Sequence, residues 1–240
     1  MRTLKVLSAL LTYPTPELIA AGLDMLAVLD REAVLPRRER AAVARLIDDL
    51  AEHDLYDAQE RYILLFDRTR SLSLHLFEHV HGESRDRGQA MVDLIQLYEE
   101  GGYTPTASEL PDFLPLFLEY ASTLAPPAAI ELLGQPGHVF AALRERLAKR
   151  GSPYEHVFTA LAALSRATLD AAALAALRAE PDPEPEDLEA LDAAWEEEEV
   201  TFGPGPGGLV AKMRQATRPA PGVQPPPSAG PRTIITNRQA

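Results

Sequence analysis

The spacing of apolar residues is the feature that most restricts the fold of this chain. Apolar side chains recur three or four positions apart, which is the repeat of an amphipathic helix, and we find no alternating strands joined by hairpin turns. Such stripes run through residues 18–29, 43–50, 58–66, 91–98, 113–120, 140–147 and 154–178. The pattern predicts an all-α fold, a single compact bundle of roughly nine or ten helices joined by short connections marked by proline or glycine.

Capping residues support several of the predicted helix boundaries. Thr15 is suited to cap a helix that begins at Pro16, because its hydroxyl accepts a hydrogen bond from a free backbone N–H and proline lacks that donor. Asp54 precedes the third stripe, and Gly101 and Gly102 close the fourth.

The composition is that of a globular chain that does not cross a membrane. Hydrophobic residues make up 46% of the 240 residues, yet no apolar run approaches the roughly 18 residues that a spanning helix needs. The N-terminal run MRTLKVLSALLTYPTPEL lacks a small-residue cleavage site, and we interpret it as a folded helix and not as a signal peptide. Because the chain has no cysteine, disulfides, thiol nucleophiles and thiolate metal sites are excluded. We expect a cytoplasmic protein without direct membrane insertion.

The charge is negative and unevenly spread. The formal net charge is −13, residues 180–200 contain eleven acidic residues and no basic one, and residues 201–240 contain five basic residues and no acidic one. An acidic body argues against nucleic acid as a partner, because contacts to phosphates need clustered Lys and Arg. A basic or amphipathic peptide would be attracted instead.

Two changes in composition divide the chain. We expect a helical domain over residues 1–179, then an acidic linker with a short helix over residues 180–202, which begins with EPDPEPED and ends near WEEEE. Proline and glycine account for 14 of the last 38 residues, so residues 203–240 are predicted to be a disordered tail that buries little apolar surface.

A possible metal site occurs in the stretch LHLFEHVHGESRDRG. His75, Glu78 and His79 fit the pattern H-x-x-E-H, in which two histidines one helical turn apart bind zinc and the glutamate acts as general base. No downstream stretch identifies a third ligand, and Gly82 is expected to end the helix one turn later. A zinc-dependent peptidase is therefore the alternative function, and a helix with these residues on its polar face is the structural alternative.

The residues after Gly82 resist a purely structural explanation. Arg85 and Arg87 fall in the first turn of a new helix, where positive charge opposes the helix dipole, and Gly88 costs about 1 kcal/mol relative to alanine inside a helix. Several broken local rules together are typical of a site. We expect a functional or structural corner, with a polar network that includes Glu78, His79, His81, Glu83, Arg85, Asp86 and Arg87.

The string ELPDFLPLFLEY at residues 109–120 is aromatic and amphipathic. Pro111 suits a first helical position, whereas Pro115 is then expected to distort the first turn. Asp112 and Glu119 place acid at the two ends of the apolar run. The string is either ordinary core or one wall of an apolar groove with acidic ends, suited to a basic amphipathic helix.

Three strings, in order, carry a resemblance to a known family. They are DAQERYILLFDRTRSLSLHLFEHVHGESRDRGQAMVDLIQLYEEGG, ELPDFLPLFLEY and LDAAWEEEEVTF. Together they resemble the nitrate reductase molybdenum cofactor assembly chaperones of the NarJ type, over roughly residues 3–202. The family string begins at Glu78 and His79 and does not require a histidine at position 75, so the zinc pattern would be accidental.

The resemblance implies the all-helical fold of the dedicated molybdoenzyme chaperones, the TorD/NarJ-like fold. It implies a cytoplasmic protein without catalysis or a cofactor of its own, which binds the N-terminal segment of the apo catalytic (alpha) subunit of respiratory nitrate reductase. Such a chaperone holds the subunit open for insertion of the molybdenum cofactor, and it delays docking on the membrane subunit.

We predict a client-binding groove from these patterns together. Its proposed members are Phe66, Leu76, Leu116, Phe117 and Tyr120 as apolar lining, and Glu78, His79, His81, Asp112 and Glu119 as groups that orient a basic client helix. The corner beside the groove comprises Gly82, Glu83, Arg85, Asp86, Arg87 and Gly88. Protonation of His79 and His81 near pH 6 is expected to modulate binding, since an ordinary histidine pKa lies near that value.

Overall fold

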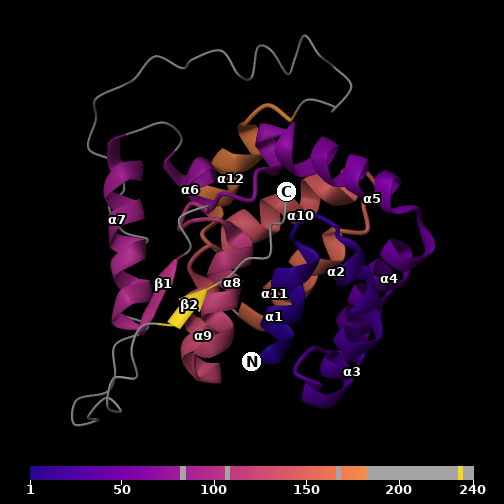
Figure 1. Ribbon diagram of the computed structural model, residues 1–240. Helices are drawn as coiled ribbons and strands as arrows, with labels where there is room; N and C mark the ends of the chain where they lie inside the picture. Colours follow the sequence, from indigo (N-terminus) through magenta and orange to yellow (C-terminus); the bar gives the residue numbers. More distant parts are fainter. Residues whose placement is uncertain (82–84, 106–108, 166–168, 183–231, 235–240) are drawn as a thin grey trace.

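Helices form nearly all of the regular structure in the computed structural model, which describes residues 1–81, 85–105, 109–165, 169–182 and 232–234 (Figure 1). The α-helices are α1 (Arg2–Leu10), α2 (Pro16–Ala20), α3 (Gly22–Glu32), α4 (Arg37–Glu52), α5 (Leu55–Tyr62), α6 (Leu76–His81), α7 (Arg85–Glu100), α8 (Leu114–Thr123), α9 (Pro126–Gly134), α10 (Gly137–Lys149), α11 (Glu155–Ser165) and α12 (Ala171–Ala179). A π-helical turn, η1 (Ile63–Asp67), and a 3-10 turn, η2 (Arg70–Leu72), follow α5. The two short strands β1 (Tyr103–Pro105) and β2 (Arg232–Ile234) pair in parallel. The all-α class is confirmed.

The described residues hold more α-helices than the nine or ten predicted, because some apolar stripes are divided. The stripe over residues 18–29 is split at Ala21, which ends α2 and precedes α3. Gly22 starts α3 against Ile47, whose side chain would lie 3.2 Å from a Cβ at position 22. α3 packs against α4, and the apolar spacing continues through the break.

The predicted capping residues act as expected. The Thr15 hydroxyl accepts a hydrogen bond from the N–H of Leu18 at 3.2 Å, and the Asp54 carboxylate accepts one from Tyr56 at 2.8 Å. α7 ends at Glu100, and Gly102 follows with a φ of +82°, a backbone conformation that glycine adopts without strain.

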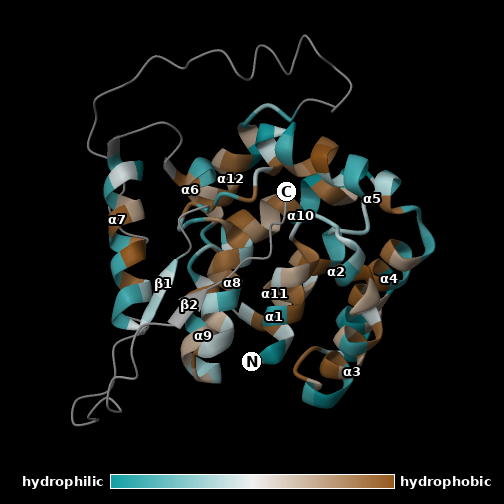
Figure 2. Cartoon of the chain, in the orientation of Figure 1, coloured by the Kyte–Doolittle hydropathy of each residue, from teal (hydrophilic) through white to brown (hydrophobic). Residues whose placement is uncertain are grey.

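The core surrounds α8. This helix packs against α1, while α10 packs against α11 and α11 also contacts α4 (Figure 1). The residues from Leu114 to Leu118 are all buried, so α8 has no solvent face over its first turns. Outer helices such as α4 and α5 instead alternate hydrophilic and hydrophobic residues (Figure 2).

α8 also begins later than the sequence suggested. Pro111 lies outside the helix, which starts at Leu114 with Pro115 in its first turn, where proline is tolerated. The expected distortion at Pro115 was therefore wrong. The residues before α8 are instead held by a contact with the segment before α6, described below.

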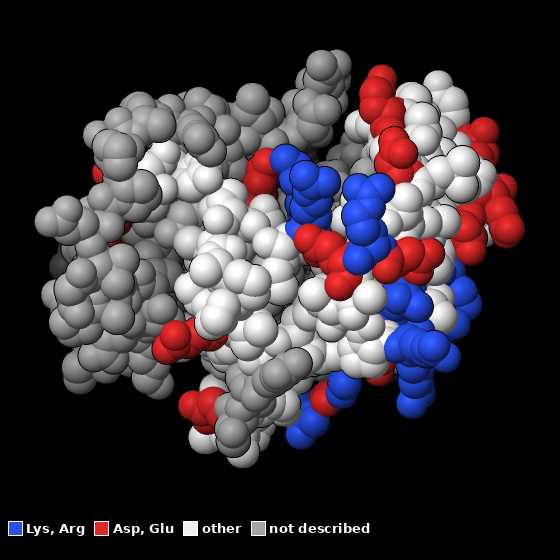
Figure 3. Space-filling model, turned by 90° about the horizontal axis from the view of Figure 1, so that it is seen from below, with Lys and Arg blue, Asp and Glu red and all other residues white. Residues whose placement is uncertain are grey.

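Charged side chains of both signs share the surface of the described part. On the face seen in Figure 3, Lys and Arg stand among Asp and Glu. Ion pairs among the described residues include Lys5–Glu119 and Arg40–Asp30, at 3.4 and 3.2 Å. No helix among the described residues is long and apolar enough to cross a bilayer. The predicted linker helix near residues 188–199 and most of the predicted tail, 203–231 and 235–240, lie outside the described residues.

Gly101 permits a close approach that a side chain would prevent. A Cβ at this position would lie 2.7 Å from the Tyr120 ring, so we expect Gly101→Ala to lower the free energy of unfolding by about 1–3 kcal/mol through overpacking. Gly88 is the matched control, because it is helical with open space around a Cβ, and Gly88→Ala should raise that free energy by up to about 1 kcal/mol. Urea denaturation of both variants measures the two effects, and equal stabilities would contradict the packing role of Gly101.

Candidate functional site

Two segments that are distant in the sequence are joined by backbone hydrogen bonds at the corner predicted above. The N–H of Leu76 donates to the carbonyl of Asp112 at 3.1 Å, and the N–H of Leu114 donates to the carbonyl of Leu74 at 2.8 Å. The two segments, residues 73–79 and 110–114, are called the clasp below. The clasp brings together the two strings, EHVHGESRDRG and LPDFLP, on which the family resemblance rests most firmly.

The buried carboxylate of Asp112 lies at the centre of the clasp. One oxygen accepts the N–H of Phe77 at 3.0 Å, and the other accepts the Nδ1–H of His75 at 3.3 Å. The side chain is fully buried, and a buried charge requires such partners. Asp112 was predicted to orient a client, but in this structure it is enclosed and holds the two segments of the chain together.

His75 does not share a helix with His79. It lies before α6 in an extended bridge with Phe113, and its ring is 5.4 Å from the ring of that residue. The helical i, i+4 pair of zinc ligands that the alternative function requires is therefore not formed, because the two rings bond to different groups of the protein. Burial alone would lower the pKa of His75, but the hydrogen bond to Asp112 and its charge raise this pKa above the usual value.

His79 is held by the chain before it. Its Nε2–H donates to the Ser73 carbonyl at 2.8 Å, which fixes the tautomer of the ring. Burial lowers the pKa of His79 to about 4, although the hydrogen bond to Ser73 acts in the opposite direction. The ring is therefore neutral between pH 5.5 and 8, and the predicted protonation of His79 near pH 6 is wrong.

An ion pair connects α6 with α7 at the corner. Arg87 donates to the Glu78 carboxylate at 3.2 Å, and both side chains are about one quarter exposed. Part of the predicted network is thus present, with Arg87 in the first turn of α7 neutralised by an acid from α6. Gly82, Glu83 and Ser84 and the side chains of His81 and Arg85 lie outside the described residues.

The predicted apolar lining of a groove belongs to the core. Phe66, Leu76, Leu116, Phe117 and Tyr120 are all buried, at most 6% exposed. Phe66 also lies in a separate aromatic cluster, with ring centroids 5.0 Å from Tyr62 and 5.1 Å from Tyr154. These residues line no open groove in this conformation. Contact between them and a client stays a prediction, and it would require the core to open.

Glu119 lies apart from Asp112, near α1. Its carboxylate accepts a hydrogen bond from Lys5 at 3.4 Å and is mostly buried. Burial raises the pKa of Glu119, although the charge and the hydrogen bond of Lys5 act against that rise. Asp112 and Glu119 therefore do not form the acidic ends of one open groove. Asp112 is enclosed in the clasp, and Glu119 is paired with Lys5 beside α1.

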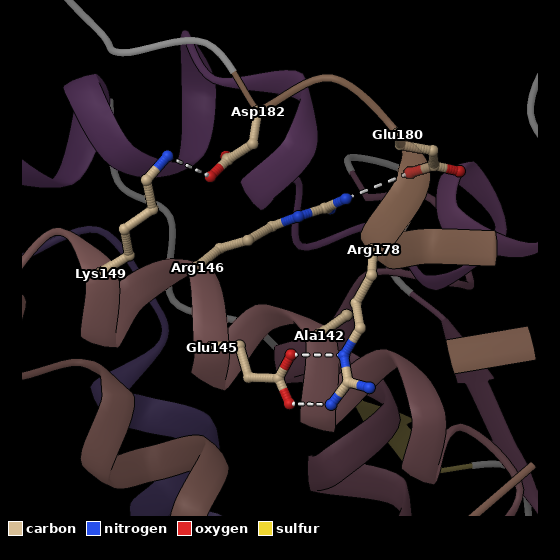
Figure 4. Close-up of a pocket in the computed structure, with 7 residues that line it drawn as sticks. All are labelled: Ala142, Glu145, Arg146, Lys149, Arg178, Glu180 and Asp182. Atoms are coloured by element: carbon tan, nitrogen blue, oxygen red, sulfur yellow. Dashed lines mark hydrogen bonds and ion pairs between the residues drawn. The ribbon is translucent and has the colours of Figure 1, made fainter. Parts of the chain in front are cut away.

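A second polar site, not anticipated from the sequence, lies between α10 and α12 (Figure 4). Arg146 is buried and donates to the carbonyls of Ser71 at 2.7 Å and Leu177 at 2.5 Å. Asp182 accepts from Arg150 at 2.6 and 3.1 Å and from the Ser71 hydroxyl at 2.7 Å. An open pocket of about 260 Å³ adjoins these groups, lined by Ala142, Glu145, Arg146, Lys149, Arg178, Glu180 and Asp182.

No local pattern in the sequence indicates this second site. Its main donors, Arg146 and Arg150, form hydrogen bonds with carbonyl groups and a carboxylate that lie 31 or more positions away along the chain. Residues 140–147 contain three charged side chains, Arg144, Glu145 and Arg146, and the apolar spacing does not show which of them is buried.

Comparisons with known proteins agree with the sequence resemblance. The family described as "Nitrate reductase delta subunit" matches residues 32–160. The chain is 41% identical over 90% of its length, and 92% of the relative's, to the nitrate reductase molybdenum cofactor assembly chaperone NarJ of Escherichia coli K12. It is 40% identical over 84% of both chains to the probable chaperone NarW of the same strain. It is also 30% identical over 67% of its length, and 86% of the relative's, to the probable NarJ chaperone of Bacillus subtilis.

The charge of Asp112 should matter for stability. We expect Asp112→Asn to lower the free energy of unfolding by about 1.5–3 kcal/mol, because an amide of the same size cannot accept from both Phe77 and His75 and the buried hydrogen bonds lose their charge. Asp48→Asn on the exposed face of α4 is the control and should change that value by less than about 0.5 kcal/mol. Similar values for the two variants in urea denaturation would contradict the role of the Asp112 carboxylate.

The neutral ring of His79 should make the fold sensitive to acid. Below pH 6.5 the unfolded chain protonates this histidine while the folded chain does so only near pH 4, so the unfolded state binds more protons and stability falls as the pH falls. One such group contributes a slope of up to about 1.4 kcal/mol per pH unit in that window.

His79→Gln keeps a side-chain N–H donor and removes the titration. We expect its free energy of unfolding to depend less on pH between 6.5 and 5 than that of the unsubstituted chain, as measured by urea denaturation at several pH values. Parallel profiles for the two proteins would show that His79 does not titrate in this way.

Proposed function

This chain belongs to the nitrate reductase delta subunit family, as an assembly chaperone of the NarJ type, and from that membership we propose that it binds the N-terminal segment of the apo catalytic (alpha) subunit of nitrate reductase. The observation that supports this most strongly is the 41% identity to the Escherichia coli chaperone over 92% of that protein. The relatives are named as assembly chaperones and not as catalysts, so the chain is not an enzyme.

The proposed action is to hold the apo subunit open while the molybdenum cofactor is inserted, and to delay its docking on the membrane subunit. We propose that the chain does this in the cytoplasm and with no cofactor of its own. These steps follow from the resemblance of the clasp strings to the family. The geometry adds that the clasp is a corner closed by hydrogen bonds to Asp112 and Ser73.

The charge of the chain favours a basic client segment. A net charge of −13 attracts basic peptides over a distance of about 8 Å at physiological ionic strength. Of the predicted orienting groups, Glu78 keeps 26% and Glu119 16% of its side chain exposed, so we propose that these two carboxylates contribute to the acidic rim. His81 remains a proposed member, since its side chain lies outside the described residues.

Co-purification tests the proposed client. The tagged chaperone should retain the apo catalytic subunit, and removal of the first few dozen residues of that subunit should reduce retention at least roughly tenfold, which corresponds to about 1.4 kcal/mol of binding free energy. A subunit whose N-terminal segment has the same composition in scrambled order is the matched control and should behave like the truncated one.

Full retention of the truncated subunit would contradict the assignment of the N-terminal segment. Absence of any complex with the intact apo subunit would contradict the proposed client itself.

A further inference from the structure

The apolar contact between α12 and the body is small, and polar contacts from Arg146 to Leu177 and from Arg150 to Asp182 hold its C-terminal end. Leu174 and Leu177 are its buried side chains, and the residues that flank them on the same helix, such as Ala175 and Ala176, are exposed. A helix of nine residues is marginal by itself in water, so α12 depends on this docking to remain folded. Such a small apolar contact is typical of an element that separates from its domain at low free energy.

The face of α10 beneath α12 carries an acid that binds a base on α12. Arg178 donates to both oxygens of the Glu145 carboxylate, with Nε and one terminal nitrogen at 2.8 and 2.6 Å (Figure 4). A planar, two-bond pair of this kind selects arginine by geometry as well as by charge. α12 is therefore a short amphipathic helix of the form Leu-x-x-Leu-Arg, and its arginine is bound by the one acid, Glu145, on a face of α10 that also carries the bases Arg146 and Lys149.

The same face also recognises the end of the helix. Arg146 donates to the carbonyl of Leu177, one of the last carbonyls of α12, where a cation is favoured by the helix dipole. Arg146 is held in place by the carbonyl of Ser71 in η2, so its guanidinium is positioned independently of α12. Glu145 and Arg146 would therefore bind any helix that places an arginine and its terminal carbonyl groups where α12 places them.

We propose that the α12-covered face of α10 is a docking site for a basic amphipathic helix of the client, and that α12 occupies this site in the free chaperone. This rests on the proposed function, because the client helix is taken from the N-terminal segment of the catalytic subunit. The client helix carries leucines three positions apart followed directly by arginine or lysine, matching Leu174, Leu177 and Arg178. The Glu145 carboxylate favours arginine or lysine at the position that Arg178 takes in α12.

Displacement of α12 has a defined effect on affinity. If only a fraction of the molecules has the face free, the apparent dissociation constant of the client is raised by the inverse of that fraction. Weakening the docking of α12 should therefore tighten client binding, provided that Glu145 and Arg146 on α10 are left intact. An ordinary destabilising substitution in a binding domain would instead weaken client binding.

The full chain with Leu174→Ser and Leu177→Ser tests the proposal. Both changes lie on α12, and they should raise the affinity for a fluorescent peptide of the client's N-terminal segment by up to roughly tenfold if α12 covers the face in about nine molecules of ten. Ala175→Ser with Ala176→Ser, on the exposed side of the same helix, is the matched control and should leave the affinity unchanged.

Glu145→Gln separates a specific site from general apolar exposure. Added to the double leucine variant, it should cancel most of the gain, since the client's basic residue loses its carboxylate. Hydrogen exchange of residues 171–179 should also speed up when the client peptide is added to the unsubstituted chain.

The two possible failures can be told apart. Equal client affinity in all these proteins, with unchanged exchange of α12, would overturn the α10 site while leaving the proposed function in place. A client peptide that binds none of them, together with failed co-purification of the apo subunit, would overturn the proposed function as well.

Discussion

The buried carboxylate of Asp112 is the interaction on which the arrangement of this corner depends. Removing such a charge from water costs several kcal/mol, and that cost is offset only if every available donor is in place. The donors come from Phe77 and His75, so the segment before α8 and the start of α6 cannot separate without leaving the charge unpaired. Tyr98 of α7 adds a bond from its hydroxyl to the carbonyl of Pro111 at 2.8 Å. Three helices thus share one polar centre.

The contacts of α12 differ from the clasp in burial and therefore in strength. Asp112 is enclosed, whereas the Glu145–Arg178 pair is open to water, where screening and side-chain entropy leave an ion pair with little net free energy. Arg146 lies between these extremes, buried but bonded to one carbonyl of the body and one of α12. Stability is therefore expected to fall from the clasp toward α12, and local opening should begin at the helix and not at the corner.

Much of the fold follows from local rules, since helical spacing and capping are local properties. Thr15 and Asp54 were identified correctly because a cap needs only the following turn. The pattern H-x-x-E-H does not form a helical pair of histidines because His75 is extended, and it is extended because of a pairing with Phe113 that no local pattern contains. Periodicity also cannot distinguish an apolar face that meets the chain's own core from one that meets a partner, which is why α8 was assigned to a groove.

These differences bear on how a client could be accommodated. Opening the core to expose Leu116 and Phe117 would forfeit about 1.5–3 kcal/mol for each such side chain and would also disturb the clasp, together a large part of the 5–15 kcal/mol that typically stabilises a domain. Releasing α12 exposes two leucines, breaks the exposed Glu145–Arg178 pair and removes the Leu177 carbonyl from Arg146, and an incoming helix of the same form restores these contacts. Exchange of one helix for another leaves the core and the clasp intact. A chaperone that must bind and then release its client gains from a site whose internal occupant competes with the client, because the returning α12 lowers the free energy of release.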